Sequence, residues 1–143
     1  AGVLVKSDRQ TPTSGNTVFG GTHGLFSTAK DYSIFARMLL NGGEWNGKRY
    51  LSPKTIEIMR INQSGDLFLD PGKGFGLGFA VVDDLAASKA SVSEGTFYWS
   101  GAYCTYFFID PKENMVAIFM TQVNPFSSYY ENKFRQMIYQ ALE

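Results

Sequence analysis

The stretch that decides the fold is residues 97–112, which read FYWSGAYCTYFFIDPK and are continued by FMTQ at residues 119–122. Aromatic and β-branched residues dominate it, and these residue types favour strands. We predict three strands, over residues 95–101, 103–109 and 115–122. The turn-forming run DPKEN between the last two predicts that they form an antiparallel hairpin.

The segments on either side extend this sheet and cover it. Residues 74–81 alternate aromatic and aliphatic side chains with glycine and alanine, which predicts a further strand. Residues 83–94 are polar and rich in alanine and serine, as expected of a connection. Residues 128–142 carry apolar side chains at helical spacing, so we predict a closing helix that covers the sheet.

The amino-terminal half has the signals of helices. Thr28 and Asp31 have capping-box spacing, and an apolar stripe follows them up to the stop signal of residues 41–43, NGG. Ser52-Pro53 begins a second helix, which we expect to end near Asn62. A short hairpin around Asn46-Gly47 is expected between the two helices.

Together these segments predict an α+β fold. We expect an antiparallel sheet of three to four strands with a C-terminal helix packed on it, preceded by a helical segment. The expected organisation is a polar arm over residues 1–19, the helical segment over 20–73, and the sheet with its closing helix over 74–143.

Composition excludes several classes of function. The chain has 143 residues, 44% of them hydrophobic and 18% charged, with thirteen basic residues balancing thirteen acidic ones. This balance gives no field that would attract nucleic acid or a membrane surface. With Cys104 as the single cysteine and His23 as the single histidine, we expect no disulfide, no metal site and no cofactor. We expect Cys104 to be a small buried side chain rather than a reactive thiol.

No targeting segment and no apolar run of membrane-spanning length is present in the sequence, so we expect a soluble protein. The compartment stays open between cytoplasm and periplasm.

Local motifs for nucleophilic catalysis are weak. A Ser-His-Asp triad would have to use His23, but no Gly-x-Ser-x-Gly motif accompanies it. Ser27 and Lys30 form a Ser-x-x-Lys pair that is chemically competent, yet helix capping already explains it. Tyr130–Asn132 and Ser14–Asn16 match a second hydrolase motif only formally. The glycines of residues 72–78 precede a strand and therefore do not predict a phosphate site.

Residues 97–112 resemble the carboxy-terminal part of the serine β-lactamase and penicillin-binding-protein-like superfamily. The resemblance is closest to the family VIII esterases, in which Trp-x-Gly commonly replaces the Lys-Thr-Gly of lactamases. Three further segments are similar to sequence segments of that family and occur in the same order, namely residues 20–32, 38–43 and 76–79. The resemblance therefore covers nearly the whole chain from Gly20 onward.

The resemblance implies a set of site residues. Trp99, Ser100 and Gly101 would be the third active-site motif, on the strand that forms one wall of the cleft. The backbone N–H of Ala102, with that of the nucleophilic serine, would form the oxyanion hole. Because Trp99 replaces a lysine that would hold a substrate carboxylate, an uncharged ester is favoured over a β-lactam, with lactam turnover left open.

The chain departs from the family in one respect. In the family, the nucleophile motif Ser-x-x-Lys and the Tyr-x-Asn motif both precede this region. Ser27 lies in a different segment, which does not supply the nucleophile in the family. We therefore expect an incomplete domain, the C-terminal portion of a serine hydrolase that acts on a small ester through an acyl-enzyme and is inactive alone. The alternative is a non-catalytic binding or interaction module that keeps the cleft wall. Uncovered sheet edges and apolar faces would favour self-association, or pairing with a missing N-terminal half.

Overall fold

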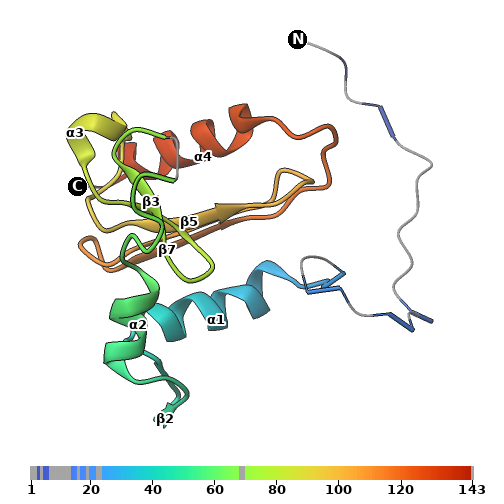
Figure 1. Cartoon of the computed structure of the whole chain (residues 1–143). Helices are drawn as coiled ribbons and strands as arrows, with labels where there is room; N and C mark the ends of the chain where they lie inside the picture. Colours follow the sequence, from blue (N-terminus) through green and yellow to red (C-terminus); the bar gives the residue numbers. More distant parts are fainter. Residues whose placement is uncertain are drawn as a thin grey trace.

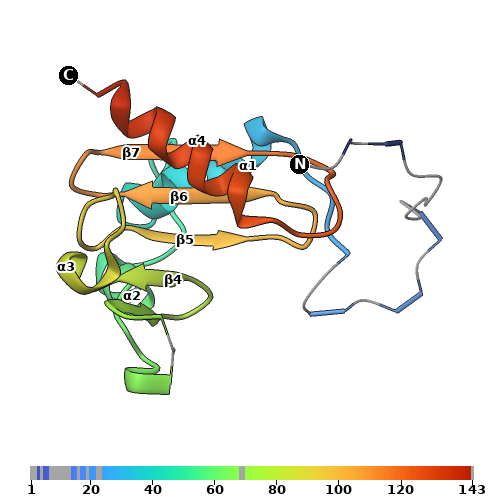
Figure 2. The same ribbon diagram turned by 90° about the horizontal axis from the view of Figure 1, so that it is seen from above.

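The sheet, for which three to four strands were predicted, has five among the residues described by the computed structural model, which are 3, 5–6, 14–15, 17–18, 20–21, 24–67 and 70–142. The strands follow one another in chain order and every neighbouring pair is antiparallel (Figure 2). They are β3 (Lys73–Phe75), β4 (Ala80–Val82), β5 (Phe97–Ser100), β6 (Tyr106–Asp110) and β7 (Met115–Phe119). The α+β class and the hairpin at residues 110–114 are confirmed.

The helices begin where their capping residues predict. Helix α1 (Ala29–Leu40) starts after Thr28, whose Oγ1 accepts a hydrogen bond from the Asp31 N–H at 3.1 Å. Helix α2 (Pro53–Met59) starts after Ser52, and α4 (Ser128–Gln140) after Ser127. Between α1 and α2, the expected hairpin consists of β1 (Glu44–Trp45) and β2 (Lys48–Arg49), with positive φ at Asn46 and Gly47.

The sheet lies between helices on both faces, with α4 on one side and α1 on the other (Figure 1). Because successive side chains of a strand point to opposite faces of the sheet, the core is divided into two clusters, one on each face. Phe97 and Phe107 belong to a cluster with Ala36 and Leu39 of α1, whereas Phe108 packs against side chains of α4. The helical segment and the sheet therefore share one hydrophobic core.

The region 74–81 differs from the single predicted strand. It forms a hairpin, β3 to β4, in which the Gly76 N–H donates to the Phe79 carbonyl at 2.8 Å and Gly78 has a φ of +96°. This turn also shortens α2, because the Met59 carbonyl accepts from the Leu77 N–H at 2.9 Å instead of continuing the helix toward Asn62. The connection 83–94 contains a short helix, α3 (Leu85–Ser88), and a 3₁₀ turn (Gly65–Leu67) precedes β3.

His23 and Asn16 lie outside the described residues, as does most of the predicted arm. In the part of the chain that is described, none of the helices combines the length and apolar character that a membrane crossing requires.

Candidate active site

The predicted motif lies where β5 ends and turns back into β6. The Gly101 N–H donates to the Thr105 carbonyl at 2.8 Å, and the Cys104 N–H donates to the Gly101 carbonyl at 3.0 Å. Cys104 has a φ of +59°, which completes a three-residue hairpin loop of a common type. Ala102 is therefore the first central residue of a tight turn, and it is exposed.

The outer edge of β5 is open at this end. Strand β4 pairs with β5 only through Phe97 and Tyr98, so the backbone from Ser100 onward has β6 on one side and no strand on the other among the described residues. Within that same set of residues, the Ala102 N–H has no hydrogen-bond partner. An exposed and unpaired N–H at a fixed turn is the kind of group that can stabilise an oxyanion.

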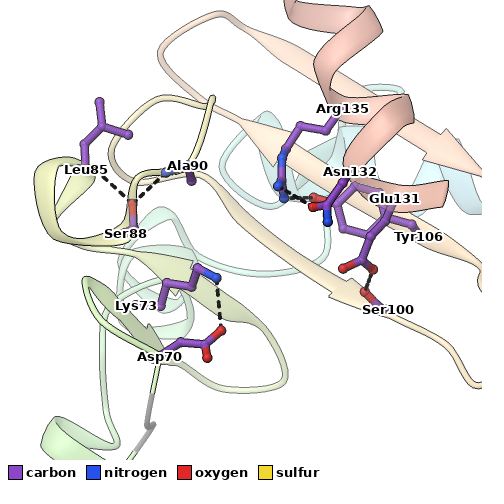
Figure 3. Close-up of polar contacts among 10 residues, drawn as sticks. All are labelled: Asp70, Lys73, Leu85, Ser88, Ala90, Ser100, Tyr106, Glu131, Asn132 and Arg135. Atoms are coloured by element: carbon purple, nitrogen blue, oxygen red, sulfur yellow. Dashed lines mark hydrogen bonds and ion pairs between the residues drawn. The ribbon is translucent and has the colours of Figure 1, made fainter. Parts of the chain in front are cut away.

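Trp99 and Ser100 point to opposite faces of the sheet, as alternation along a strand requires. The Trp99 ring lies edge-on to Phe75 of β3, with the ring centroids 5.1 Å apart, and the side chain is 45% exposed. The Ser100 hydroxyl instead donates a hydrogen bond to the carboxylate of Glu131 on α4 (Figure 3). The two side chains of the motif therefore have different surroundings: Trp99 offers an aromatic surface, and Ser100 connects the strand to the helix.

A pocket of about 470 Å³ opens beside this end of β5, between the β3–β4 hairpin and the first turns of α4. The motif residues 99–102 form one wall. Charged side chains lie on the others, namely Asp70, Lys73, Glu131 and Arg135.

Two of the four charged side chains around the pocket compensate each other in an ion pair. Lys73 Nζ lies 3.0 Å from Asp70 Oδ2, and Glu131 is held by Ser100 (Figure 3). Arg135 donates to Asn132 Oδ1 at 2.7 Å and forms no ion pair with any described carboxylate. The pocket thus has polar groups of both signs rather than one uniform field.

Two tyrosines near Arg135 remain protonated at neutral pH. Burial raises the pKa of Tyr98 to about 12, although the nearby Arg135 guanidinium opposes the shift. Burial likewise raises the pKa of Tyr106 to about 12, again against the effect of Arg135, which donates to the Tyr106 hydroxyl at 3.4 Å. Neither phenol is therefore activated as a general base.

The other candidates are not brought into a catalytic arrangement. The Ser27 hydroxyl donates to the Thr28 carbonyl at 3.3 Å, and no hydrogen bond joins it to Lys30 in the described structure. Cys104 is buried, as expected. Of the described His, Cys, Asp and Glu side chains, no three form a group that could hold a metal ion.

Sequence reasoning missed the contribution of α4 to this site. Tyr130–Asn132 drew attention only as a formal motif, whereas the structure places Glu131 against Ser100 and Asn132 at the pocket. Arg135 and Lys73 gave no signal at all. An acidic residue in the first turn of a predicted helix was visible in the sequence, but its partner 31 residues earlier was not.

Comparison with known proteins adds independent information. A family model described as Beta-lactamase matches residues 3–141. Uncharacterized protein MT1414 and Protein Rv1367c, from two strains of Mycobacterium tuberculosis (CDC 1551 / Oshkosh and ATCC 25618 / H37Rv), are each 40% identical to this chain over 114 residues. The match covers 71% of this chain and 28% of each relative, so the chain spans less than a third of the length of these relatives.

A solved structure is also similar. The structure of EstCE1, described as a hydrolase with promiscuous acyltransferase activity, matches with a TM-score of 0.64 and 28% sequence identity. The match covers 76% of this chain and 29% of the EstCE1 chain, so the fold corresponds to part of that structure.

Proposed function

Because this chain belongs to the β-lactamase family, as the resemblance of residues 97–112 predicts, we propose that it provides one wall of the active site of a serine hydrolase that cleaves carboxylic esters. The single observation that carries the proposal is the Ala102 N–H, unpaired within the described structure, at the open end of β5 and beside a pocket. The likeness to EstCE1, a hydrolase, supports the same reaction class.

The proposed reaction has two steps. A serine hydroxyl loses its proton and attacks the ester carbonyl, and the oxyanion accepts a hydrogen bond from the Ala102 N–H. The C–O bond to the alcohol then breaks as the alcohol takes up the proton that the serine released. Water then attacks the acyl-serine and releases the acid. An alcohol in place of water would give acyl transfer, which is the second activity in the description of EstCE1.

The nucleophile is proposed to come from outside these 143 residues. In the family, the nucleophilic serine belongs to a Ser-x-x-Lys motif. The one such pair in this sequence, Ser27 and Lys30, lies in a segment that does not correspond to that motif. The chain by itself is therefore inactive in this proposal, and a longer protein that contains it is the esterase.

The substrate is proposed to be an uncharged ester. Trp99, where lactamases have lysine, offers a half-exposed aromatic surface and no cation to the bound acyl or alcohol group. The proposed partner of the whole protein is thus a small-molecule ester.

Intact-mass spectrometry after treatment with a fluorophosphonate probe tests the proposal. We expect the longer protein to gain the mass of one probe and the 143-residue chain to gain none. Labelling of this chain would contradict the proposed location of the nucleophile, and a longer protein that resists the probe and leaves p-nitrophenyl esters intact would contradict the hydrolase itself.

A binding module is the second candidate. It is favoured by the pocket of about 470 Å³, which exists here without a nucleophile pair in contact with it. This candidate predicts that a p-nitrophenyl ester or its acid product binds to the chain, which isothermal titration can measure. It also predicts that no longer form of the protein hydrolyses the ester.

A further inference from the structure

We infer that Glu131 of α4 is a positioning residue for the Ala102 amide, because it fixes the open end of β5 through Ser100. This inference rests on the proposed function, since it concerns the same oxyanion donor. Glu131 itself does not contact the substrate in this scheme; it acts through Ser100.

The end of β5 needs such support. Beyond Tyr98 it has no partner on its outer edge within the described residues, so its backbone is held by β6 alone. An open strand end of this kind frays more readily than a strand paired on both sides. The Ser100 hydroxyl is half-buried and donates to the Glu131 carboxylate, which adds an anchor on the residue just before Gly101.

The far side of the same turn is held by the connection between β7 and α4. The Tyr103 carbonyl accepts from Thr121 Oγ1 at 2.6 Å and from the Val123 N–H at 3.2 Å. The Cys104 thiol sulfur accepts from the Ser127 N–H at 3.3 Å. Residues 121–127 thus fix the turn after Ala102, and Glu131 fixes the strand before it.

The carboxylate of Glu131 is itself well placed to act as an anchor. It lies in the first turn of α4, where the helix dipole favours a negative charge. Packing of Phe134, Ile138 and Tyr139 on the sheet fixes the helix. Among the described residues, Ser100 is the hydrogen-bond partner of the Glu131 carboxylate, and no lysine or arginine forms an ion pair with this carboxylate.

Stabilisation of an oxyanion requires a rigidly held donor. An oxyanion donor contributes only if it is already aimed at the developing charge, and supporting residues must hold it to within roughly 0.5 Å. A hydrogen bond from the adjacent strand residue to a packed helix supplies that rigidity at Ala102.

The test combines one measurement on this chain with one on the longer protein. The variants are Glu131→Ala, Glu131→Gln, Ser100→Ala and the double variant. Glu113→Ala is the control, because Glu113 is an exposed acid in the turn between β6 and β7. In the 143-residue chain, ¹⁵N relaxation measures the order parameter of the Ala102 amide.

In Glu131→Ala and Ser100→Ala, the Ala102 order parameter should fall from roughly 0.85 to below roughly 0.6. Glu131→Gln should retain most of the rigidity, because its amide oxygen still accepts from Ser100, and Glu113→Ala should change nothing. In the longer protein, kcat for a p-nitrophenyl ester should fall by roughly tenfold with KM within about twofold. The double variant should lose no more than either single variant, because both remove one interaction.

An unchanged Ala102 order parameter in Glu131→Ala would overturn the inference, as would losses that multiply in the double variant. If the longer protein hydrolyses no ester, the proposed function fails, and the relaxation measurement alone then decides whether Glu131 positions the turn.

Discussion

The indole ring of Trp99 meets the ring of Phe75 edge-on, with the centroids 5.1 Å apart, so the aromatic residue of the motif is supported by the neighbouring hairpin and still 45% exposed. A side chain that is braced on one side and open on the other suits contact with an apolar part of a ligand.

In the longer protein, Trp99→Ala should raise KM for an aryl ester by roughly twofold to tenfold, because an aromatic contact contributes about 0.5–1.5 kcal/mol beyond area burial. Trp99→Lys should shift the preference toward a carboxylate-bearing ester. Trp45→Ala is the control: Trp45 lies in β1 with Arg37 above its ring, and its loss should leave the kinetics unchanged. Equal kinetics for Trp99→Ala and wild type would refute contact between Trp99 and the substrate.

Ala102→Pro removes the proposed oxyanion donor and little else. Ala102 is the first central residue of a turn and does not have positive φ, which is a position that accepts proline. The variant should lose roughly 10²–10³-fold in kcat, corresponding to about 2.7–4 kcal/mol of transition-state stabilisation. Stopped-flow kinetics of acylation would measure it.

The control is Ala102→Gly, which keeps the N–H and should stay within about tenfold of wild type. The free energy of unfolding of the proline variant, from urea titration, should change by less than about 1 kcal/mol. Full activity in Ala102→Pro would exclude this amide as an oxyanion donor.

Asp110 makes the free energy of unfolding decrease as the pH falls into the acid range. It is buried, and burial by itself would raise its pKa. Hydrogen bonds from the Tyr139 hydroxyl, from Ser93 and from the Glu113 N–H hold the pKa of this carboxyl below the ordinary 3.8. The Lys112 N–H also donates to Asp110 Oδ1, at 3.0 Å. Because the pKa is lower in the folded state, the carboxylate stabilises the fold above about pH 4 and loses that effect as the pH falls through the folded pKa.

Asp110→Asn should therefore lower the free energy of unfolding by about 1–3 kcal/mol at neutral pH, since it replaces an acceptor with an amide that faces donors. The loss of stability on acidification should also be smaller than in wild type. Urea titrations at neutral pH and at about pH 3 measure both effects. Asp66→Asn, at an exposed acid, should show neither change, and an equal acid response in Asp110→Asn and wild type would contradict the assignment.

The outer edge of β7 predicts that this chain associates with a second copy of itself. Within the described residues β7 ends the sheet, and its sequence MVAIF has no charge or proline to block edge pairing. Two such edges can pair antiparallel about Ala117. Light scattering should show a mass that rises with concentration above that of one chain.

Met120→Lys should reduce this association, because Met120 is 39% exposed directly after β7 and lysine protects sheet edges. Met137→Lys is the matched control, at an exposed position on α4. A chain that stays monomeric at high concentration, or two lysine variants that behave alike, would rule out the β7 edge as the contact. Pairing of this edge with a strand from the rest of a longer protein would instead abolish association in that protein.

The sequence by itself determined the local elements and the family. Thr28, Ser52 and the Asn46-Gly47 turn fix their elements through hydrogen bonds and backbone angles within a few residues, so their signals are readable without a structure. Residues 99–102 were likewise recognisable as a motif, and the match to the β-lactamase family model confirms the family.

Only the tertiary structure decided what surrounds that motif. The contact of Ser100 with Glu131 joins residues 31 positions apart, and it depends on how α4 packs on the sheet through Phe134. The β3–β4 hairpin likewise depends on a backbone contact between Leu77 and the end of α2. Local patterns carry no information on such contacts, because their free energy comes from side chains that meet only after the sheet and helices have assembled.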